Sequence, residues 1–532
     1  MGKDKKTNKE RVKLMTYLKH DNNFIYFKGL EHEAAKLGAT FVGSIRAYKL
    51  PMNPYTLKEL QNHINSHIVN DLLGKQVAKH NFMRSLKERV APKLGDLRPY
   101  QAVDVGILRN HPRLAIFNEQ RTGKTPTILT ALQNYEGGMV VCPASLKLNW
   151  LKEAKRWAKK DYIVITGTKA KRKKLYETSG RANIIIGYET LRTDIVDILK
   201  RYSKFSFLVV DEAHRLRNYK TKQSVAVLKI GGMSERIYPM TGTPAVNHPA
   251  DVFGILKLLN KMKFRAYWQF VDRYFANYDT PFGRKIGEIR ADRENEFNNL
   301  LYDHSLQRKR RDVMAWVPKV THRTIELEPT SKQNGLMREV IRKNTLLGNE
   351  IPNAITKLTR LRQICVDPMY FGVNTQSPKV KFILDYIEDN PDETVIVFST
   401  MTGALIRLHS QINGAMILTG RQTTEGKQFA VDQIQKGKSR VLLANIKAGG
   451  TGFTLDKADT IIFLDKSYTP DENQQAGDRF IPVDPDAIYG AKQIITLLVN
   501  GSVEPKIEVL LDRKINIISY VNDYGLKGIL DL

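Results

Sequence analysis

The sequence predicts an α/β protein with two similar lobes, each a parallel sheet covered by helices, together with helical insertions and a small N-terminal α/β module. Short apolar segments alternate with amphipathic helical stretches in two separate parts of the chain. This alternation is typical of parallel sheets with helices on both faces. The 532 residues, 42% of them hydrophobic, are enough for three or four compact units with their own cores.

The N-terminal module is predicted, with its connector, over residues 1–90. Residues 1–12 are basic and polar. Strand-like runs follow in NFIYF, ATFVGS and IRAYKLP, and a helical pattern, YTLKELQNHI, begins behind Pro54. A polar, helix-rich segment over 65–95 then leads into the first lobe.

The first lobe is predicted over residues 91–260 and the second over 376–532, which includes a C-terminal helix. The first carries the strand runs RLAIF, GMVVC, YIVIT, NIIIG, FLVVD and RIYPM. The second carries TVIVF, AMILT, RVLLA, TIIFLD and QIITLLV. The segment between them, 261–375, is predicted to be helical and polar. Its aromatic residues are spaced as on a helix and fit a core better than a binding surface; they are Tyr267, Trp268, Phe270, Tyr274 and Phe275.

The charge of the chain favours a nucleic-acid-binding protein, and its cysteine content argues against zinc-binding and disulfide-rich classes. Lys and Arg total 84 against 55 Asp and Glu, a formal net charge of +29. Such an excess favours nucleic acid as a partner over solubility alone. The two cysteines, Cys142 and Cys365, exclude a zinc site built from cysteine pairs and argue against a disulfide framework. With neither a membrane-length apolar run nor a signal-peptide pattern at the start, we expect no membrane association and a cytoplasmic location, the host cytoplasm for a viral chain.

A phosphate-binding loop is predicted directly after the strand RLAIF, in the segment NEQRTGKTPTILTAL. Gly123 lets the backbone wrap a phosphate, Lys124 provides a cation for the terminal phosphates, and Thr125 provides a hydroxyl for Mg²⁺. Pro126 occupies the first helical turn, where its missing N–H costs nothing. Asn118 stands where a glycine usually begins such a loop. A chance loop is therefore the alternative for this segment taken alone.

A pair of carboxylates follows the strand FLVVD. Asp211 is at its C-terminal tip, a position from which a carboxylate can hold Mg²⁺ beside a nucleotide. The adjacent Glu212 can orient or deprotonate the attacking water. Two surface carboxylates at a strand end are the alternative, and the upstream phosphate loop makes the nucleotide site the better interpretation.

The residues 211–214, DEAH, resemble motif II of superfamily 2 helicases and translocases. The same order of motifs includes LRPYQ, CPASLKLNW, GYETL, MTGTPAVN, LTRLRQICVDP, IKAGGTGFTL and QAGDR. LRPYQ, TGTPxxN and LRQICxxP together are typical of the Swi/Snf-like branch, and the resemblance covers residues from about 90 to 500. It implies two RecA-like lobes, ATP and Mg²⁺ in the cleft between them, and DNA as the partner.

The resemblance also implies roles for individual residues. Those implied in catalysis are Lys124, Asp211, Glu212, Gln475 and Arg479. Those implied in nucleotide binding are Arg98, Gln101, Thr122, Gly123, Lys124, Thr125 and Gly452, with Gln101 reading adenine. Thr125 and Asp211 are implied as metal ligands. Those implied in DNA contact are Pro143, Ser145, Asn149, Trp150, Thr190, Lys447, Gly449, Gly450 and Thr451. Thr241, Gly242 and Thr243 are implied in coupling hydrolysis to the grip on DNA. Contacts of this kind to phosphates position DNA without reading its sequence.

Two positions depart from the pattern of the family. Its last motif usually has two arginines that reach the γ-phosphate, and Pro482 occupies the place of the second one here. An arginine finger contributes roughly 10³–10⁵ to the rate, so losing the only one would make a very poor ATPase. Because the rest of the site, including Lys124 and Glu212, is intact, we expect Arg479 to carry the role alone, and a neighbouring arginine that substitutes is the alternative. Arg121 stands where the branch usually has glycine. Its alternatives are a solvated side chain and a contact with DNA or between the lobes.

Two basic runs and the N-terminal module have open alternatives. KAKRKK, at 169–174, fits a solvated helix face better than a DNA site. QRKRRDVMAWVPK, at 307–319, resembles the arginine-rich connection of the family, where interlobe coupling or DNA contact competes with surface charge. The N-terminal module resembles the HARP-type modules ahead of annealing helicases. That resemblance implies DNA binding, and the alternative is docking of a replication or transcription protein through residues 1–90.

The function that these patterns favour is an ATP-dependent DNA translocase or helicase that remodels forks, branches or protein–DNA complexes. Chromatin remodelling fits less well, because no histone-reading segment is recognisable. A strand-separating helicase is the nearest alternative. A catalytically weak DNA-binding accessory factor, with Pro482 marking lost activity, is the alternative from a different class.

Overall fold

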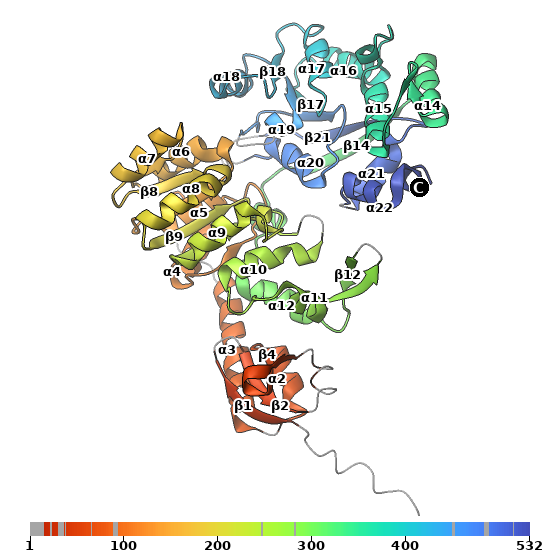
Figure 1. The fold of residues 1–532 in the computed structure, drawn as a ribbon. Helices are drawn as coiled ribbons and strands as arrows, with labels where there is room; N and C mark the ends of the chain where they lie inside the picture. The colour runs from red at the N-terminus through yellow and green to blue at the C-terminus, as the bar shows by residue number, and fades with distance from the viewer. Residues whose placement is uncertain are drawn as a thin grey trace, which may run out of the picture. The chain divides into compact units, whose positions relative to one another are not determined.

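The computed structural model describes residues 15–21, 24–29, 34, 37, 39–64, 66–88, 94–245, 248–280, 283–449, 453–482, 489–513 and 515–531 (Figure 1). The chain forms two compact units. The first unit contains residues 1–119 and 123–309, and the second contains 120–122 and 310–532. The chain therefore crosses from one unit to the other at residues 120–122 and at the arginine-rich segment around residue 310.

The N-terminal module of the first unit is a four-stranded antiparallel sheet backed by helices. The strand order is β1 (Thr16–His20), β2 (Phe24–Lys28), β4 (Ala47–Pro51), β3 (Thr40–Val42), and α2 (Pro54–Gln61) and α3 (His67–Glu88) follow. Asn53 caps α2 by accepting from the Thr56 amide, and Pro54 fits its first turn. Leu57 and Leu60 of α2 lie in one core with Ile25 and Phe27 of β2. The three sequence-predicted strands and the helix are present, and β1 is an additional strand.

The main sheet of the first unit has seven strands in the order β13-β5-β10-β9-β6-β8-β7, all parallel. The strands are β5 (Ala115–Ile116), β6 (Met139–Cys142), β7 (Tyr162–Val164), β8 (Asn183–Gly187), β9 (Phe205–Asp211), β10 (Ser234–Met240) and β13 (Ser305–Leu306). The helices are α4 (Pro99–Asn110), α5 (Lys124–Ala131), α6 (Lys147–Trp157), α7 (Lys169–Thr178), α8 (Tyr188–Arg201), α9 (Lys222–Gly232) and α10 (Phe253–Leu259). The six strand runs predicted for this lobe are all present.

The continuous apolar strands of this sheet are explained by two separate cores. Val140 and Ile185 pack in one hydrophobic cluster, whereas Val141 and Ile186 pack in another. Successive side chains of a strand point to opposite faces, so a sheet covered by helices on both faces requires apolar residues at every position.

The insertion after this sheet differs in part from its prediction. It contains α11 (Tyr267–Tyr274) and α12 (Glu294–His304), but also an antiparallel hairpin of β11 (Phe275–Thr280) and β12 (Gly283–Ile289). The expectation of an all-helical segment is therefore wrong for 275–289, where most side chains are exposed or half-buried and give no apolar strand signal. Of the five aromatic residues, Phe270, Tyr274 and Phe275 are buried in one core, while Trp268 is exposed beneath the guanidinium of Arg284.

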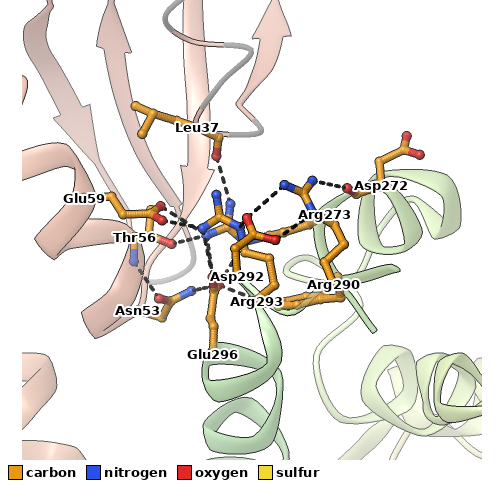
Figure 2. Close-up of polar contacts among 11 residues, drawn as sticks. Leu37, Asn53, Thr56, Glu59, Asp272, Arg273, Arg290, Asp292, Arg293 and Glu296 are labelled. Carbon is orange, nitrogen blue, oxygen red and sulfur yellow. Dashed lines mark hydrogen bonds and ion pairs between the residues drawn. The ribbon is translucent and has the colours of Figure 1, made fainter. Parts of the chain in front are cut away.

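The N-terminal module is fastened to this insertion by a buried ion pair (Figure 2). Arg273 of α11 donates to both carboxylate oxygens of Glu296 on α12, at 2.8 Å each. It also donates to the Leu37 carbonyl at 3.0 Å and to the Thr56 hydroxyl at 2.9 Å, both in the module. Asn53 of the module donates to Glu296 at 3.0 Å. Because the buried pair takes part of its hydrogen bonding from the module, the module is an integral part of the first unit.

The second unit is built on a six-stranded parallel sheet in the order β14-β21-β20-β17-β19-β18. The strands are β14 (Val320–Leu327), β17 (Val395–Ser399), β18 (Met416–Leu418), β19 (Val441–Asn445), β20 (Thr460–Phe463) and β21 (Lys492–Val499). A small hairpin joins β15 (Thr345–Leu346) and β16 (Asn349–Glu350). The helices are α13 (Arg310–Val313), α14 (Ser331–Lys343), α15 (Ala354–Val366), α16 (Pro378–Asp389), α17 (Thr402–His409), α18 (Thr424–Gln435), α19 (Ile446–Gly449), α20 (Pro470–Gly477), α21 (Glu504–Asp512) and α22 (Ile517–Leu530).

The five strand runs predicted for the second lobe are all present, and β14 is an unpredicted edge strand. Its exposed and half-buried side chains carry no apolar run, and it is held by pairing along its whole length with β21. Both units thus have the parallel α/β architecture that the sequence predicts. No helix among the described residues is both long and apolar enough to span a membrane.

Candidate active site

The phosphate loop of the first unit lies between β5 and the start of α5. Gly123 has φ 77° and ψ 41°, the left-handed region that favours glycine. A Cβ at this position would lie 2.0 Å from Nε2 of Gln101. The backbone angles therefore favour glycine here, and a larger residue would also displace the side-chain amide of Gln101.

The side chain of Lys124 reaches back to the first residues of the loop. Its Nζ donates to the carbonyl oxygens of Asn118 at 2.9 Å and Glu119 at 3.1 Å. Asn118 is buried and donates to Asp104 at 3.0 Å, and Asp104 also pairs with Arg308 at 2.7 Å. The residue that replaces the usual first glycine thus fastens the loop to α4, which explains how the loop keeps its shape without that glycine.

Gln101 and Arg98 begin helix α4 beside the loop. The side-chain oxygen of Gln101 accepts from the backbone N–H of Arg98 at 2.8 Å and so satisfies a free amide at the start of the helix. Gln101 is buried and its amide faces Gly123. This places the predicted adenine-reading residue against the predicted phosphate loop.

The acidic pair lies at the C-terminal end of β9. Asp211 accepts from the Trp150 indole N–H at 2.9 Å and from the backbone N–H of Glu212 at 2.9 Å. Burial and then the charge of Glu212 raise the pKa of Asp211 to about 6, against the opposing effects of Trp150 and Lys124. Glu212 itself has φ 50°, a conformation that costs a non-glycine residue roughly 1–3 kcal/mol and is typical of functional sites.

This arrangement has the donor set that a nucleotide with Mg²⁺ needs. A half-buried carboxylate such as that of Asp211, with a second carboxylate beside it, is stabilised in its charged form by a cation. Thr125, the other predicted metal ligand, is half-buried in the first turn of α5, directly after Gly123 and Lys124. The residues of the first unit therefore fit both groups, with Lys124 for the phosphates and Asp211 and Thr125 for the metal ion.

Trp150 corrects one prediction. Its side chain is 1% exposed and its indole is bonded to Asp211, so it supports the acidic pair and is not placed to grip a DNA strand. Pro143 of the same motif is also buried, whereas Ser145 and Asn149 are exposed and remain candidates for phosphate contact. Thr190, at the start of α8, is half-buried.

A chain of polar contacts leads from the acidic pair to the predicted coupling motif. Nδ1 of His214 lies 3.3 Å from a carboxylate oxygen of Glu212 and 3.1 Å from the Thr241 hydroxyl. The Thr241 hydroxyl in turn accepts from the Thr243 amide at 3.1 Å. The half-buried Gly242 lies between these two threonines. These contacts connect Glu212 to the loop after β10.

The second unit holds the predicted arginine in a well-defined loop. Gln475 is in α20, and Asp478 and Arg479 begin the turn that follows it. Arg479 donates to the Phe453 carbonyl at 3.2 Å, and Arg310 pairs with Asp478 at 2.7 Å. Pro482, in place of the second arginine, is buried.

Arg121, whose role the sequence left open, donates four hydrogen bonds to this loop. Residues 120–122 belong to the second unit, where Thr122 is buried. The Arg121 guanidinium donates to the carbonyls of Phe453, Asp478 and Arg479 and to the Thr454 hydroxyl, at 2.7–3.2 Å. Its φ is 66°, which explains why glycine suits the position. Arg121 is therefore a structural arginine that fixes the backbone beside Arg479.

The remaining DNA-contact predictions fall near the end of β19. Lys447 is exposed in α19, which also contains Gly449. Gly450, Thr451 and Gly452 lie outside the described residues. In the KAKRKK run, Arg172 pairs with Asp194 through two bonds of 2.6 and 2.7 Å, while the lysines of α7 are exposed. That run is a solvated helix face with one structural arginine.

Several of these functional contacts were not predicted. His214 was noted only as a letter of the DEAH pattern, and the buried Tyr188, which donates to the Asp211 carbonyl at 2.5 Å, was not singled out. Both connect residues far apart in sequence. Their signal was limited to their positions inside the DEAH and GYETL motifs.

Comparisons with known proteins identify the family of the chain. The family model of the SNF2-related domain matches residues 9–370, and the helicase conserved C-terminal domain matches 378–481. The chain is similar to Protein CHROMATIN REMODELING 5 of Arabidopsis thaliana, at 26% identity over 88% of this chain and 29% of that one. It is also similar to the probable ATP-dependent DNA helicase CHR23 of the same plant, at 25% identity over 86% and 46%. A third relative is the DNA annealing helicase and endonuclease ZRANB3 of Bos taurus, at 24% identity over 79% and 40%.

Among solved structures, the Sulfolobus solfataricus SWI2/SNF2 ATPase core in complex with dsDNA matches at 20% identity and a TM-score of 0.39. The match covers 83% of this chain and 99% of that one. The chain spans less than half the length of the curated relatives named above.

Proposed function

Because the chain belongs to the SNF2-related family, we propose that it is a DNA-dependent ATPase that uses ATP hydrolysis to move along duplex DNA. The observation that carries the proposal is the contact chain from Glu212 through His214 to Thr241. These contacts join Glu212, which is suited to activate water, to the loop after β10, which is suited to respond to hydrolysis. An inert nucleotide-binding fold has no need of such a link.

The residues of the first unit would act on ATP in distinct ways. Lys124 would bind the terminal phosphates, and Thr125 and Asp211 would hold Mg²⁺, which supplies charge stabilisation for phosphoryl transfer. Glu212 would orient the attacking water and accept its proton. Trp150 would keep Asp211 oriented toward the metal ion, and Arg479 would supply the transition-state arginine.

The chain would bind DNA through the phosphates of the DNA backbone. Ser145, Asn149 and Lys447 are exposed and have the hydroxyl, amide and ammonium groups that bind phosphates. With a net charge of +29, we expect binding that weakens steeply as salt rises. The finer function that we favour is remodelling of forks, branches or protein–DNA complexes, supported by relatives described as DNA helicases and as a DNA annealing helicase.

The test is steady-state ATP hydrolysis without nucleic acid and with duplex, forked or single-stranded DNA, for the wild type and Glu212→Gln. We expect duplex or forked DNA to stimulate the wild type, and the substitution to lower the stimulated rate by about 10²–10⁴-fold. Glu189→Gln is the matched control, because Glu189 is an exposed carboxylate of the same unit paired with Arg192 on the surface. Background hydrolysis with every nucleic acid would refute the proposal for the isolated chain.

A second candidate, a weak ATPase that acts mainly as a DNA-binding factor, is favoured by Pro482 alone. Arg479→Ala separates the two. A loss of about 10³-fold or more in DNA-stimulated hydrolysis indicates that one arginine suffices. Trace hydrolysis in the wild type, unchanged by Arg479→Ala but with salt-sensitive DNA binding intact, would favour the DNA-binding factor.

A further inference from the structure

The N-terminal sheet has an outer face whose chemistry the motor does not explain. Strand register places Lys19, Tyr26, Lys49 and Thr40 in one row across β1, β2, β4 and β3. Phe24 lies two residues before Tyr26 and therefore points to the same side. We call these five residues the outer sheet face.

The opposite face of the sheet is the core face. Ile25 and Leu50, paired across β2 and β4, are fully buried, and helices α2 and α3 contribute Leu57, Leu60 and Val69 to the same cluster. The residues of the outer sheet face are exposed or half-exposed. The sheet therefore has one side packed on helices and an outer side that is partly open to solvent and borders the insertion at Phe24, Thr40 and Lys49.

Aromatic rings and ammonium groups alternate on the outer sheet face. Nζ of Lys19 lies 5.2 Å from the centre of the Tyr26 ring, and Nζ of Lys49 lies 4.5 Å from that of Phe24. The two rings are 6.5 Å apart at 62°. One carboxylate is close by, that of Asp21, which accepts from the Tyr26 hydroxyl at 3.0 Å and the Phe24 amide at 2.8 Å.

The basic and aromatic character continues onto the insertion. A hollow of about 60 Å³ is lined by Phe24 and Lys49 of the module and by Lys263 and Phe264 ahead of α11. Arg265, next in the chain, is exposed. Burial and then the charge of Arg265 lower the pKa of Lys49, an effect opposed by Asp21. A bound anion would relieve the repulsion between Lys49 and Arg265.

We propose that the outer sheet face binds an unpaired strand of DNA, with Phe24 and Tyr26 stacking on bases and Lys19, Lys49 and Arg265 contacting phosphates. Stacking on aromatic rings requires bases that are out of a duplex, and a positively charged surface follows the backbone of the strand. The proposal deepens the proposed function and rests on it only for the source of the unpaired strand, a fork or branch at which the motor works.

The buried Arg273–Glu296 ion pair fixes the position of the outer sheet face on the first unit. Arg273, whose contacts with Glu296, Leu37 and Thr56 are drawn in Figure 2, also lines the hollow beside Phe24 and Lys49. The strand that binds the outer sheet face is thereby held on the same unit that carries the phosphate loop.

The first test measures binding of fluorescein-labelled oligo(dT) and of a hairpin duplex to the full chain over a range of salt. In Lys19→Gln/Lys49→Gln, we expect the slope of log K against log salt for oligo(dT) to become shallower by about 1.4, at roughly 0.7 per phosphate contact. The control is Lys58→Gln/Lys75→Gln, which removes the same charge from exposed positions on α2 and α3. Equal effects of the two pairs, or no effect of either, would overturn the proposal.

The second test concerns the rings. Tyr26→Ala is expected to weaken oligo(dT) binding by roughly tenfold, within the range for loss of one stacked base, and to leave duplex-stimulated ATP hydrolysis unchanged. Phe41→Ala is the control, because Phe41 is an exposed ring on β3 that lies outside the outer sheet face. Equal losses for the two variants would contradict the stacking role.

A third measurement does not depend on variants. The wild-type chain is irradiated with oligonucleotides that contain 5-iodouracil, and the cross-linked peptides are mapped. We expect cross-links at Phe24 or Tyr26. Cross-links confined to the two parallel-sheet lobes would overturn the proposal, and would show that this face serves a protein partner or none. Failure of the motor would instead abolish duplex-stimulated hydrolysis without moving the cross-links.

Discussion

Breaking the buried Arg273–Glu296 ion pair, which joins the insertion to the N-terminal module, is expected to lower the free energy of local unfolding of the module by several kcal/mol, about 3–5 at most. Arg273→Met removes the closer of two cations from the buried carboxylate of Glu296, since Arg273 and Glu296 are both less than 5% exposed and Arg293 lies at 3.5 Å from the same carboxylate. Removing one partner of such a pair costs about 3–5 kcal/mol, whereas replacing both with apolar residues of similar volume is close to neutral. Arg273→Met/Glu296→Leu is therefore expected to restore most of the stability that Arg273→Met loses.

The assay is hydrogen–deuterium exchange of the α2 amides in the full chain, which reports the free energy of local opening. Arg284→Met is the matched control. Arg284 pairs with Asp272 in the same insertion, but both are partly exposed, and such pairs contribute about 0–1 kcal/mol. A change of less than about 1 kcal/mol for Arg273→Met, or one equal to that of the control, would refute the view that this pair anchors the module.

Substitutions at three further positions test the site. Gly123→Ala is expected to abolish binding of a fluorescent ATP analogue, because its Cβ would strike the side chain of Gln101; Gly137→Ala has a similar φ but open space, so it controls for backbone strain. Trp150→Phe removes the bond to Asp211 and is expected to raise the Mg²⁺ concentration needed for half-maximal hydrolysis, and unchanged Mg²⁺ dependence would contradict the supporting role. Arg121→Gly and Arg121→Ala are both expected to lower kcat more than they change KM for ATP, with Ala lower in stability by about 1 kcal/mol because it keeps the strained φ.

The sequence predicted the sheets where strands are buried on both faces. Val140, Val141, Ile185 and Ile186 belong to strands whose every position is apolar, so their signal is local. Among the strands that were not predicted, β11, β12 and β14 are exposed or lie at an edge, where pairing with a neighbour replaces apolar burial as the source of stability.

The residues of the site also divide into those that the sequence predicts and those whose role depends on the fold. Lys124, Asp211 and Glu212 were predictable because the chemistry needs those residue types at the ends of strands and the start of a helix. The roles of Trp150 and Arg121 were not predictable, because each depends on a partner far away in the chain: Trp150 on Asp211, and Arg121 on the carbonyls around Arg479. A motif shows that a residue is important, and only the fold shows what it touches.

The most direct test of the central claim is displacement of a third strand from a short DNA triplex placed on a long duplex. The wild type with ATP and Mg²⁺ is expected to release the third strand as it moves along the duplex, while Glu212→Gln binds the same duplex and releases none. Release by the wild type that depends on ATP would establish movement on duplex DNA. DNA-stimulated hydrolysis without release of the third strand would contradict it.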